Sequence, residues 1–289
     1  MIIKVHILNA FTKNTQGGNP AGVVLEADNL SNNQMQRIAK KVGFSETAFV
    51  LKSDKADFKV QFFTPNGEVD LCGHATIATF FLMAKLELIQ VGKYTQETKA
   101  GVLNIKVRPD GTIFMNQNTP QFFQVIGKEE VADSLNVPIE VIDSDFPIQI
   151  VSTSSKNIII PIKSVKDLLL IKPDFKKITK ICKKHDAGGY HLFTLETKFN
   201  STAHCRSFVP RYGILEDPAH GTANGALSCY LWKYHKVDEQ QIQNLIYEQG
   251  YSMAKPSEIL VNLKIEGEKI VEVKVGGTVS TIQQKEIKI

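Results

Sequence analysis

Three side chains that can transfer protons stand beside apolar segments of this chain. Glu46 opens the apolar run 46–50, His74 starts an apolar helical pattern, and Asp217 lies four residues before Gly221. A carboxylate or imidazole held partly away from water is suited to abstract a proton near neutral pH. The residue types also allow plainer roles: a helix-cap partner or strand-edge charge for Glu46, an Asp-Pro turn for Asp217, and a solvated loop for His220.

The segments around two of these residues repeat along the chain. The pattern Gly-x-Ala-x-x-Ala occurs at 73–78 and again at 221–226, and each copy follows a Phe-x-Pro, at 63–65 and 208–210. The offsets of 148 and 145 residues are nearly equal, and both are close to half of the 289 residues. Collinear matches at one offset are typical of an internal duplication.

Both repeats place a glycine and a small or hydrogen-bonding residue at the start of an apolar helical pattern. The first N–H groups of a helix have no partner within it, and they carry the positive end of the helix dipole. Gly73, Gly221 and Thr222 leave these groups open to a carboxylate or phosphate, which a glycine allows to approach closely. A single motif of this kind is most often an ordinary helix cap. Because the motif is duplicated, we expect both helix starts to bind one anionic substrate.

Hydrophobic periodicity predicts many strands and few helices. We expect strands near 2–7, 22–25, 47–51, 58–63, 103–107, 113–116, 158–162, 192–195, 258–265 and 270–275, and helices near 31–42, 74–86, 129–135, 179–185 and 222–234. Strands and helices do not alternate strictly, which favours an α+β fold. The duplication then predicts two similar half-domains, residues 1–118 with about 276–289 and residues 119–275, with an active-site cleft between them.

Composition narrows the class of protein. The 34 basic and 30 acidic residues leave a net charge of +4 without basic runs, so nucleic acid is not an expected partner. The opening segment lacks the pattern of a secretory signal, and the longest apolar stretch is too short to cross a bilayer. Four cysteines without a CxxC pair suit a reducing cytoplasm. We find no dinucleotide or phosphate-loop motif and no paired spacing of metal ligands, and therefore expect neither cofactor nor metal.

Four motifs carry a resemblance to a known family. They are Gly-Asn-Pro-Ala-Gly at 18–22, Ser-Glu-Thr-Ala-Phe-Val at 45–50, Cys-Gly-His-Ala-Thr at 72–76 and Glu-Asp-Pro-Ala-His-Gly-Thr-Ala at 216–223. In order, spacing and total length the chain resembles the phenazine-biosynthesis isomerases, or PhzF-like proteins, over essentially its whole length. The resemblance implies a diaminopimelate epimerase-like fold, in which each half wraps a curved sheet or barrel around a central helix. It also implies a homodimer.

The resemblance further implies roles for particular residues. In the best understood member of the family, the glutamate that matches Glu46 moves a proton between two carbons of a dihydro-hydroxyanthranilate ring without metal or coenzyme. His74 and Asp217 would orient the substrate and assist the transfer. The substrate, a small anionic metabolite, would be held through its carboxylate by a set of binding residues, Gly73, Gly221, Thr222, His220 and Asn19. The family more often has threonine and serine around the second glycine, so His220 leaves the identity of the substrate open.

Two other classes of function remain as alternatives. A cysteine-dependent racemase or epimerase would use Cys72 as one of two thiols, although the second half offers Asp217 where the partner thiol would stand. A non-catalytic protein would use the same helix starts only to bind a carboxylate metabolite. Thiol alkylation and proton exchange in deuterated water distinguish these classes from an acid–base isomerase.

Overall fold

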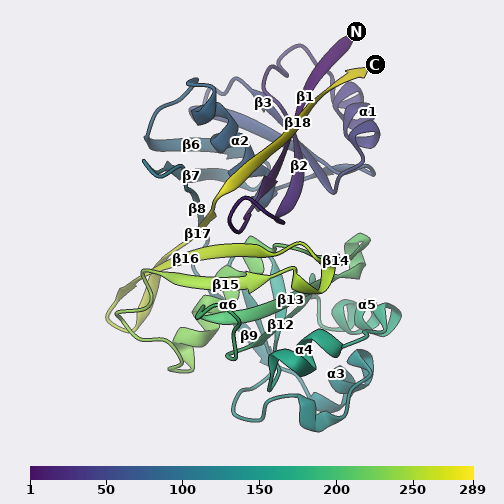
Figure 1. Cartoon of the computed structure of the whole chain (residues 1–289), viewed down its shortest axis with the longest axis vertical. Helices are drawn as coiled ribbons and strands as arrows, with labels where there is room; N and C mark the ends of the chain where they lie inside the picture. Colours follow the sequence, from purple (N-terminus) through teal and green to yellow (C-terminus); the bar gives the residue numbers. More distant parts are fainter. The chain divides into compact units, whose positions relative to one another are not determined.

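The chain folds into two compact units, Met1–Asn116 with Gly276–Ile289, and Gln117–Val275 (Figure 1). The structure is a computed structural model that describes residues 1–280 and 283–289 in full, and the backbone of 281 and 282 within the last strand. Within this described part, no helix is long and apolar enough to cross a membrane.

The first unit consists of nine strands and two helices. In chain order they are β1 (Ile2–Ala10), β2 (Asn19–Val24), α1 (Asn32–Val42), β3 (Glu46–Leu51), β4 (Phe58–Phe63), β5 (Glu68–Val69), α2 (Gly73–Lys85), β6 (Gly92–Thr98), β7 (Gly101–Val107), β8 (Ile113–Gln117) and β18 (Val279–Lys288). The first and last strands, β1 and β18, run antiparallel side by side, which brings both chain termini to this unit (Figure 1).

The second unit repeats this plan with additional helices. Its elements are β9 (Gln121–Val125), α3 (Lys128–Leu135), η1 (Ile139–Val141), β10 (Gln149–Ser152), β11 (Lys156–Pro161), α4 (Val165–Leu170), α5 (Phe175–Lys184), β12 (Gly189–Thr194), β13 (Ala203–Val209), η2 (Pro210–Tyr212), β14 (Ile214–Asp217), α6 (Gly221–Lys233), β15 (Leu245–Gln249), η3 (Tyr251–Met253), β16 (Ser257–Glu266) and β17 (Lys269–Gly277). Helices α3 and α5 pack on each other, and α4 and α5 contact β12.

Strand pairing in the two units follows one sequence of steps. In the first unit β1–β2 is antiparallel, β2–β3 parallel, β3–β4 antiparallel, β4–β6 parallel and β6–β7 antiparallel. In the second, β10–β11, β11–β12, β12–β13, β13–β15 and β15–β16 repeat these directions in the same order. The short strands β5 and β14 each pair with the strand that precedes them. The predicted α+β fold of two similar halves is therefore confirmed.

Each unit has one helix that is buried on nearly all sides. Helix α2 contacts β1, β2, β3 and β7, and every residue from His74 to Phe80 is buried. Helix α6 contacts β10, β11 and β16, and ten of its thirteen residues are buried. A helix surrounded by a sheet has no solvent-exposed face, which explains why both helices are mostly apolar, while the buried polar side chains of Asn224 and Ser228 are hydrogen-bonded. Helix α1 is amphipathic and covers a sheet from outside, with Met35 and Ile38 inward.

All the predicted helices and strands are present, but several elements were not predicted. The prediction missed α4 and the strands β5, β6, β9, β10, β13, β14 and β15, and it left the last strand unbounded. Strand β13 reads Ala-His-Cys-Arg-Ser-Phe-Val and is buried at every position, but its polar residues interrupt the continuous apolar run that is typical of a fully buried strand. Strand β9 was not predicted for the opposite reason: none of its residues is fully buried.

Candidate active site

The acid–base residues of the first unit converge where two parallel strands begin. Strands β2 and β3 pair in parallel from Ala21 and Glu46, so Asn19 and Glu46 both lie near the starting edge of the sheet. Helix α2 starts at the same place, with Cys72 as its N-cap and His74 as its second residue. Three predicted residues from distant parts of the chain are thus brought together.

Glu46 and His74 form the centre of this group. Nε2 of His74 lies 3.3 Å from Oε2 of Glu46, with 9% and 13% of the side chains exposed. On the other side of the ring, Nδ1 of His74 lies 3.4 Å from the amide nitrogen of Asn19. Oε2 of Glu46 is buried and accepts no aligned hydrogen bond from the described residues. This carboxylate oxygen therefore keeps its capacity to accept a proton.

Cys72, the thiol of the epimerase alternative, also lies beside His74. Its Sγ lies 3.4 Å from Nδ1 and 3.8 Å from Nε2 of His74. Ligand atoms of Glu46, Cys72 and His74 all lie within 4.8 Å of one another, but Sγ is closer to Nδ1 than to Nε2 and so lies over the ring, away from the Nε2 lone pair that would bind a metal ion. Sequence spacing does not reveal this group of three residues, because Glu46 belongs to another element, 26 residues before Cys72.

The backbone N–H groups at the start of α2 are open to the approach of an anion. The N-cap Cys72 makes no side-chain capping hydrogen bond. A Cβ added at Gly73 would meet one atom within 4 Å, Sδ of Met115 at an ordinary 3.6 Å. Packing within the protein therefore does not require glycine at this position. The absence of a side chain is consistent with space for a bound ligand.

Asp217 and His220 lie together in the second unit. Asp217 ends β14, and its Oδ1 accepts a hydrogen bond of 3.1 Å from the backbone N–H of Ala219. Its Oδ2 is 3.9 Å from Nδ1 of His220, with 12% and 18% of the side chains exposed. The same Nδ1 lies 2.8 Å from Oγ of Ser207, a buried residue of β13 that the sequence did not single out.

A buried hydrogen-bond network holds this segment from behind. Nε2 of Gln249 donates to the backbone oxygen of Asp217 at 2.7 Å, and its Oε1 accepts from Asn224 at 2.9 Å. Oδ1 of Asn224 lies 3.3 Å from Nε2 of His191. Burial of His191, together with the nearby His220, lowers the pKa of His191 from 6.5 to about 3. Its neutral imidazole is therefore part of the structural support.

The two central helices begin alike, but the chemistry around them differs. Helix α6 starts at Gly221, followed by Thr222, and its N-cap His220 makes no side-chain capping hydrogen bond. His220 thus takes the place that Cys72 has in the first unit. The counterpart of Glu46, as first residue of the third strand, is Gly189, where a Cβ would collide with the carbonyl oxygen of Phe208. A second acid cannot occupy that position, and the acid of this unit is Asp217 instead.

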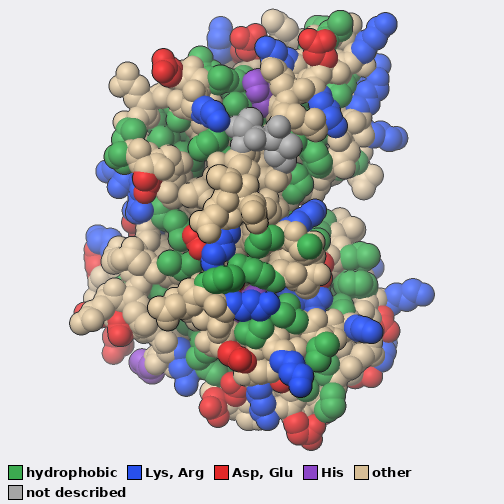
Figure 2. Space-filling model, viewed as in Figure 1, with side chains coloured by type: hydrophobic (Ala, Val, Ile, Leu, Met, Phe, Trp, Pro, Cys, Tyr) green, Lys and Arg blue, Asp and Glu red, His purple; other side chains and the backbone are tan. Residues whose placement is uncertain are grey.

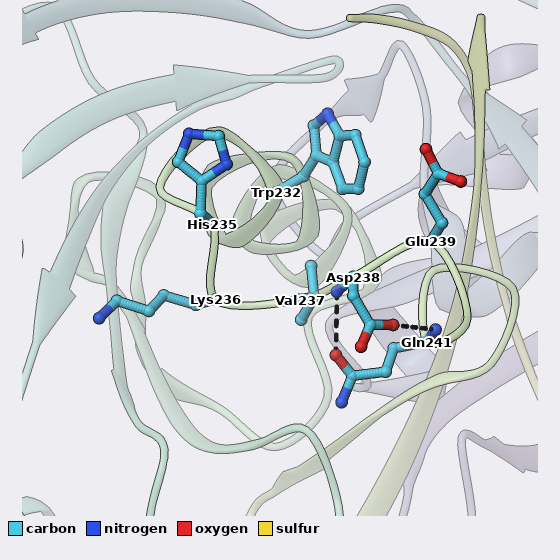
Figure 3. Close-up of a pocket in the computed structure, with 7 residues that line it drawn as sticks. All are labelled: Trp232, His235, Lys236, Val237, Asp238, Glu239 and Gln241. Carbon is cyan, nitrogen blue, oxygen red and sulfur yellow. Dashed lines mark hydrogen bonds between the residues drawn. The ribbon is translucent and has the colours of Figure 1, made fainter. Parts of the chain in front are cut away.

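A separate hollow lies at the other end of α6 (Figure 3). It is lined by Trp232, His235, Lys236, Val237, Asp238, Glu239 and Gln241. Asp238 and Gln241 close the turn by two reciprocal hydrogen bonds of 2.9 Å. The thirteen residues of α6 span about 20 Å. The hollow is therefore remote from His220, and none of the predicted site residues lines it.

Charges on the surface are mixed. On the face seen in Figure 2, basic and acidic side chains are scattered among polar and apolar ones, and the visible described residues form no continuous basic stripe. This distribution agrees with the small net charge of +4.

Comparison with known proteins shows the family of the chain. The sequence profile of the family described as phenazine biosynthesis-like protein matches residues 8–285. The chain therefore belongs to this family, the PhzF-like isomerases, as the motifs predicted. The uncharacterized isomerase YfhB of Bacillus subtilis is 35% identical over 287 residues, covering 97% of each chain.

Two further proteins place the chain among isomerases of known fold. The trans-2,3-dihydro-3-hydroxyanthranilate isomerase of Pseudomonas chlororaphis is 29% identical over 283 residues, covering 94% of each chain. The crystal structure of a PhzF-family protein from Bacillus anthracis superposes with a TM-score of 0.92 at 36% identity, over the full length of both chains. Epimerase and racemase structures at 10–11% identity share the fold alone. The diaminopimelate epimerase-like fold is thus as predicted.

Proposed function

We propose that the chain is an isomerase that moves a proton between two carbons of a small carboxylate-bearing metabolite, without coenzyme or metal. Glu46 is the residue that takes and returns the proton. The observation that carries the proposal is the state of its Oε2, which is buried and 3.3 Å from His74 Nε2 but receives no aligned hydrogen bond. Such an oxygen can accept a carbon-bound proton without first giving up a partner.

His74 and Asn19 supply the orientation that this step needs. The amide nitrogen of Asn19 faces Nδ1 of His74, an arrangement that leaves the ring proton on Nε2, on the side of Glu46 but not aligned with its Oε2. An imidazole N–H donor beside the carboxylate can stabilise charge that develops on the substrate when the proton leaves. His74 therefore assists the transfer, and Glu46 performs it.

The open helix starts are proposed to bind the substrate carboxylate. Gly73 and Gly221 begin helices whose N-caps make no side-chain capping bond, so backbone donors and the helix dipole are available for an anion. Thr222, His220 and Asn19 would add side-chain contacts. We propose that Asp217 takes part in the same reaction as a second proton-transfer group.

A cysteine-dependent epimerase is supported less well. Such an enzyme needs two thiols, and the place equivalent to Cys72 is taken by His220. Burial raises the pKa of Cys205 and Cys229 in the second unit, so neither is poised to act as a base.

Proton exchange in deuterated water tests the proposal. The purified chain is incubated with the substrate of the Pseudomonas relative, trans-2,3-dihydro-3-hydroxyanthranilate, and with a panel of unsaturated or carbonyl-bearing carboxylates. We expect deuterium to enter a carbon position, together with isomerised product, in the presence of a chelator and without added coenzyme. A chain that binds these carboxylates but exchanges no carbon-bound proton would be a binding protein and not an isomerase.

A further inference from the structure

A buried arginine lies next to the segment that carries Asp217. Arg206 of β13 has 6% of its side chain exposed, and its Nε and Nη2 donate to the two carboxylate oxygens of Glu216, each at 2.9 Å. Its Nη1 donates to the backbone oxygens of Leu168 and Ile171 at the end of α4, also at 2.9 Å. A paired contact between guanidinium and carboxylate fixes the orientation of both groups as well as their distance. Glu216 is therefore held to the body of the second unit by one side chain.

This ion pair lies on one face of two strands whose other face carries site residues. Successive residues of a strand point to opposite faces of the sheet. The residues that follow Arg206 and Glu216 are Ser207 and Asp217, which are direct partners in the sheet and lie beside His220. Strand β14 has only four residues and pairs with β13 in an irregular register, so its backbone pairing alone constrains it weakly. The ion pair therefore helps to place the carboxylate on the opposite face.

The first unit contains the same arrangement around Glu68 of β5. Glu68 precedes Glu216 by 148 residues, and Gln61 of β4 precedes Arg206 by 145, which are the two offsets of the duplicated motifs. Nε2 of Gln61 donates to Oε1 of Glu68 at 3.0 Å, and Nζ of Lys99 lies 2.7 Å from its Oε2. Because both halves have it, a glutamate held from the preceding strand belongs to the shared plan of the segment that leads to each central helix.

The two arrangements differ where the chemistry differs. The residue after the glutamate is Val69 in the first unit and the acid Asp217 in the second. In the first unit the holding groups are an amide and Lys99, whose side chain is 53% exposed, whereas the second unit has the buried guanidinium of Arg206. Lysine makes a flexible point contact, while the planar guanidinium fixes geometry. A buried ion pair often adds little stability compared with apolar packing, so its presence beside Asp217 favours a role in orientation.

We propose that Arg206 is a positioning residue of the site. Through Glu216 it fixes the orientation of the Asp217 carboxylate, whose Oδ1 accepts the N–H of Ala219, and it thereby fixes the turn that leads into α6. Its effect on catalysis rests on the proposed function, in which Asp217 transfers a proton. Its effect on the order of residues 214–221 does not depend on that function.

Hydrogen exchange tests the positioning without any substrate. Arg206→Lys keeps the charge and removes the paired contact, and Glu216→Gln weakens the same contact from the other side. Exchange mass spectrometry compares a peptide that covers residues 214–221 with peptides from β11 and α3 of the same unit. In both variants we expect exchange in 214–221 to be at least about 10-fold faster and exchange in the other peptides to be unchanged. Arg37→Lys, at an exposed arginine of α1, should exchange like the wild type.

Kinetics with a substrate that the wild type converts separate positioning from general stability. We expect Arg206→Lys to lower kcat by at least about 10-fold with a smaller change in KM, because a misplaced acid affects the reaction more than binding. The double variant Arg206→Lys with Asp217→Asn should be no slower than Asp217→Asn alone, since both substitutions act on the same group. Circular dichroism checks that each variant is folded.

The outcomes separate this proposal from the proposed function. Unchanged exchange in 214–221 of either folded variant, or faster exchange throughout the second unit, would overturn the positioning role whatever the activity. A wild-type kcat in Arg206→Lys, or losses that multiply in the double variant, would also overturn it. Conversely, a wild-type chain that converts no substrate, but whose variants loosen only residues 214–221, would leave the positioning role supported and refute the proposed function alone.

Discussion

Nε2 of His74 lies 3.3 Å from Oε2 of Glu46, although the two residues come from α2 and β3 and stand 28 positions apart. The parallel pairing of β2 with β3 and the packing of α2 against both strands bring them together. The duplicated fold does not repeat this pair, since the second unit has Gly189 where the first has Glu46. An asymmetric set of acids and bases on a symmetric plan suits a reaction with one principal proton carrier.

We predict that Gly73→Ala weakens substrate binding without destabilising the fold. A Cβ at this position meets only Met115 at 3.6 Å among the described atoms, and alanine favours a helix more than glycine does. The methyl group would instead crowd the backbone donors at the start of α2. We expect KM for the carboxylate substrate to rise roughly 5-fold or more, with the melting temperature unchanged or slightly higher. Gly67→Ala, in an open turn, is the control. An unchanged KM would show that this helix start does not bind the substrate.

Asp217→Asn is predicted to lower kcat by about 10²-fold with a smaller effect on KM, because it removes a proton-transfer group and keeps its shape. Asp145→Asn, at an exposed acid of the same unit, should behave like the wild type. Steady-state kinetics of both variants decide this. Full activity of folded Asp217→Asn would assign Asp217 to the turn that it forms with Ala219 and not to the reaction.

The buried His191 predicts a particular dependence of stability on pH. Its pKa is 6.5 when unfolded and about 3 when folded, so acid protonates the unfolded chain first. Its contribution to stability is therefore constant above about pH 6.5 and is lost as the pH falls toward 3. Between pH 8 and pH 5.5 this single group should lower the free energy of unfolding by about 1.4 kcal/mol.

Urea unfolding of variants at the two pH values measures this loss. His191→Gln should lose about 1.4 kcal/mol less than the wild type between pH 8 and pH 5.5, whatever its stability at pH 8. His235→Asn, at an exposed histidine, should retain the wild-type dependence. Equal losses in His191→Gln and the wild type would mean that His191 is protonated in the folded protein.

The chain is further predicted to form a homodimer, as its resemblance to the family implies. Sheet edges in such folds are usually covered or paired. Multi-angle light scattering at micromolar concentration should give twice the chain mass of 32.2 kDa. A mass of one chain at that concentration would contradict the prediction.

Much of the fold could be predicted because its strongest signals are local. The apolar helices α2 and α6 and the repeated glycine motif at their starts are visible in the sequence, and they lead to two similar halves. Strand β13 could not be predicted, because its histidine, arginine and serine are buried through partners that are distant in the chain.

The residues of the candidate site also divide into those that the sequence predicts and those that it does not. Glu46, His74 and Asp217 stand in recognisable motifs, whereas Ser207 and Gln249 support the second group of site residues through contacts that no spacing reveals. Cys72 was visible, but its relation to Glu46 depends on how β3 lies against the start of α2. Contacts between distant segments set the orientation of these side chains, and sequence patterns carry little information about them.

The central claim is that Glu46 carries the proton, and Glu46→Gln tests it most directly. The amide keeps the size of the side chain and removes the group that accepts a proton. The variant is incubated in deuterated water with a substrate that the wild type converts. We predict that the rates of carbon-bound proton exchange and of isomerisation both fall by at least about 10²-fold, while substrate affinity stays nearly the same. Glu26→Gln, at an exposed glutamate of the same unit, should exchange at the wild-type rate. Wild-type exchange by folded Glu46→Gln would contradict the account and assign the proton transfer to another residue.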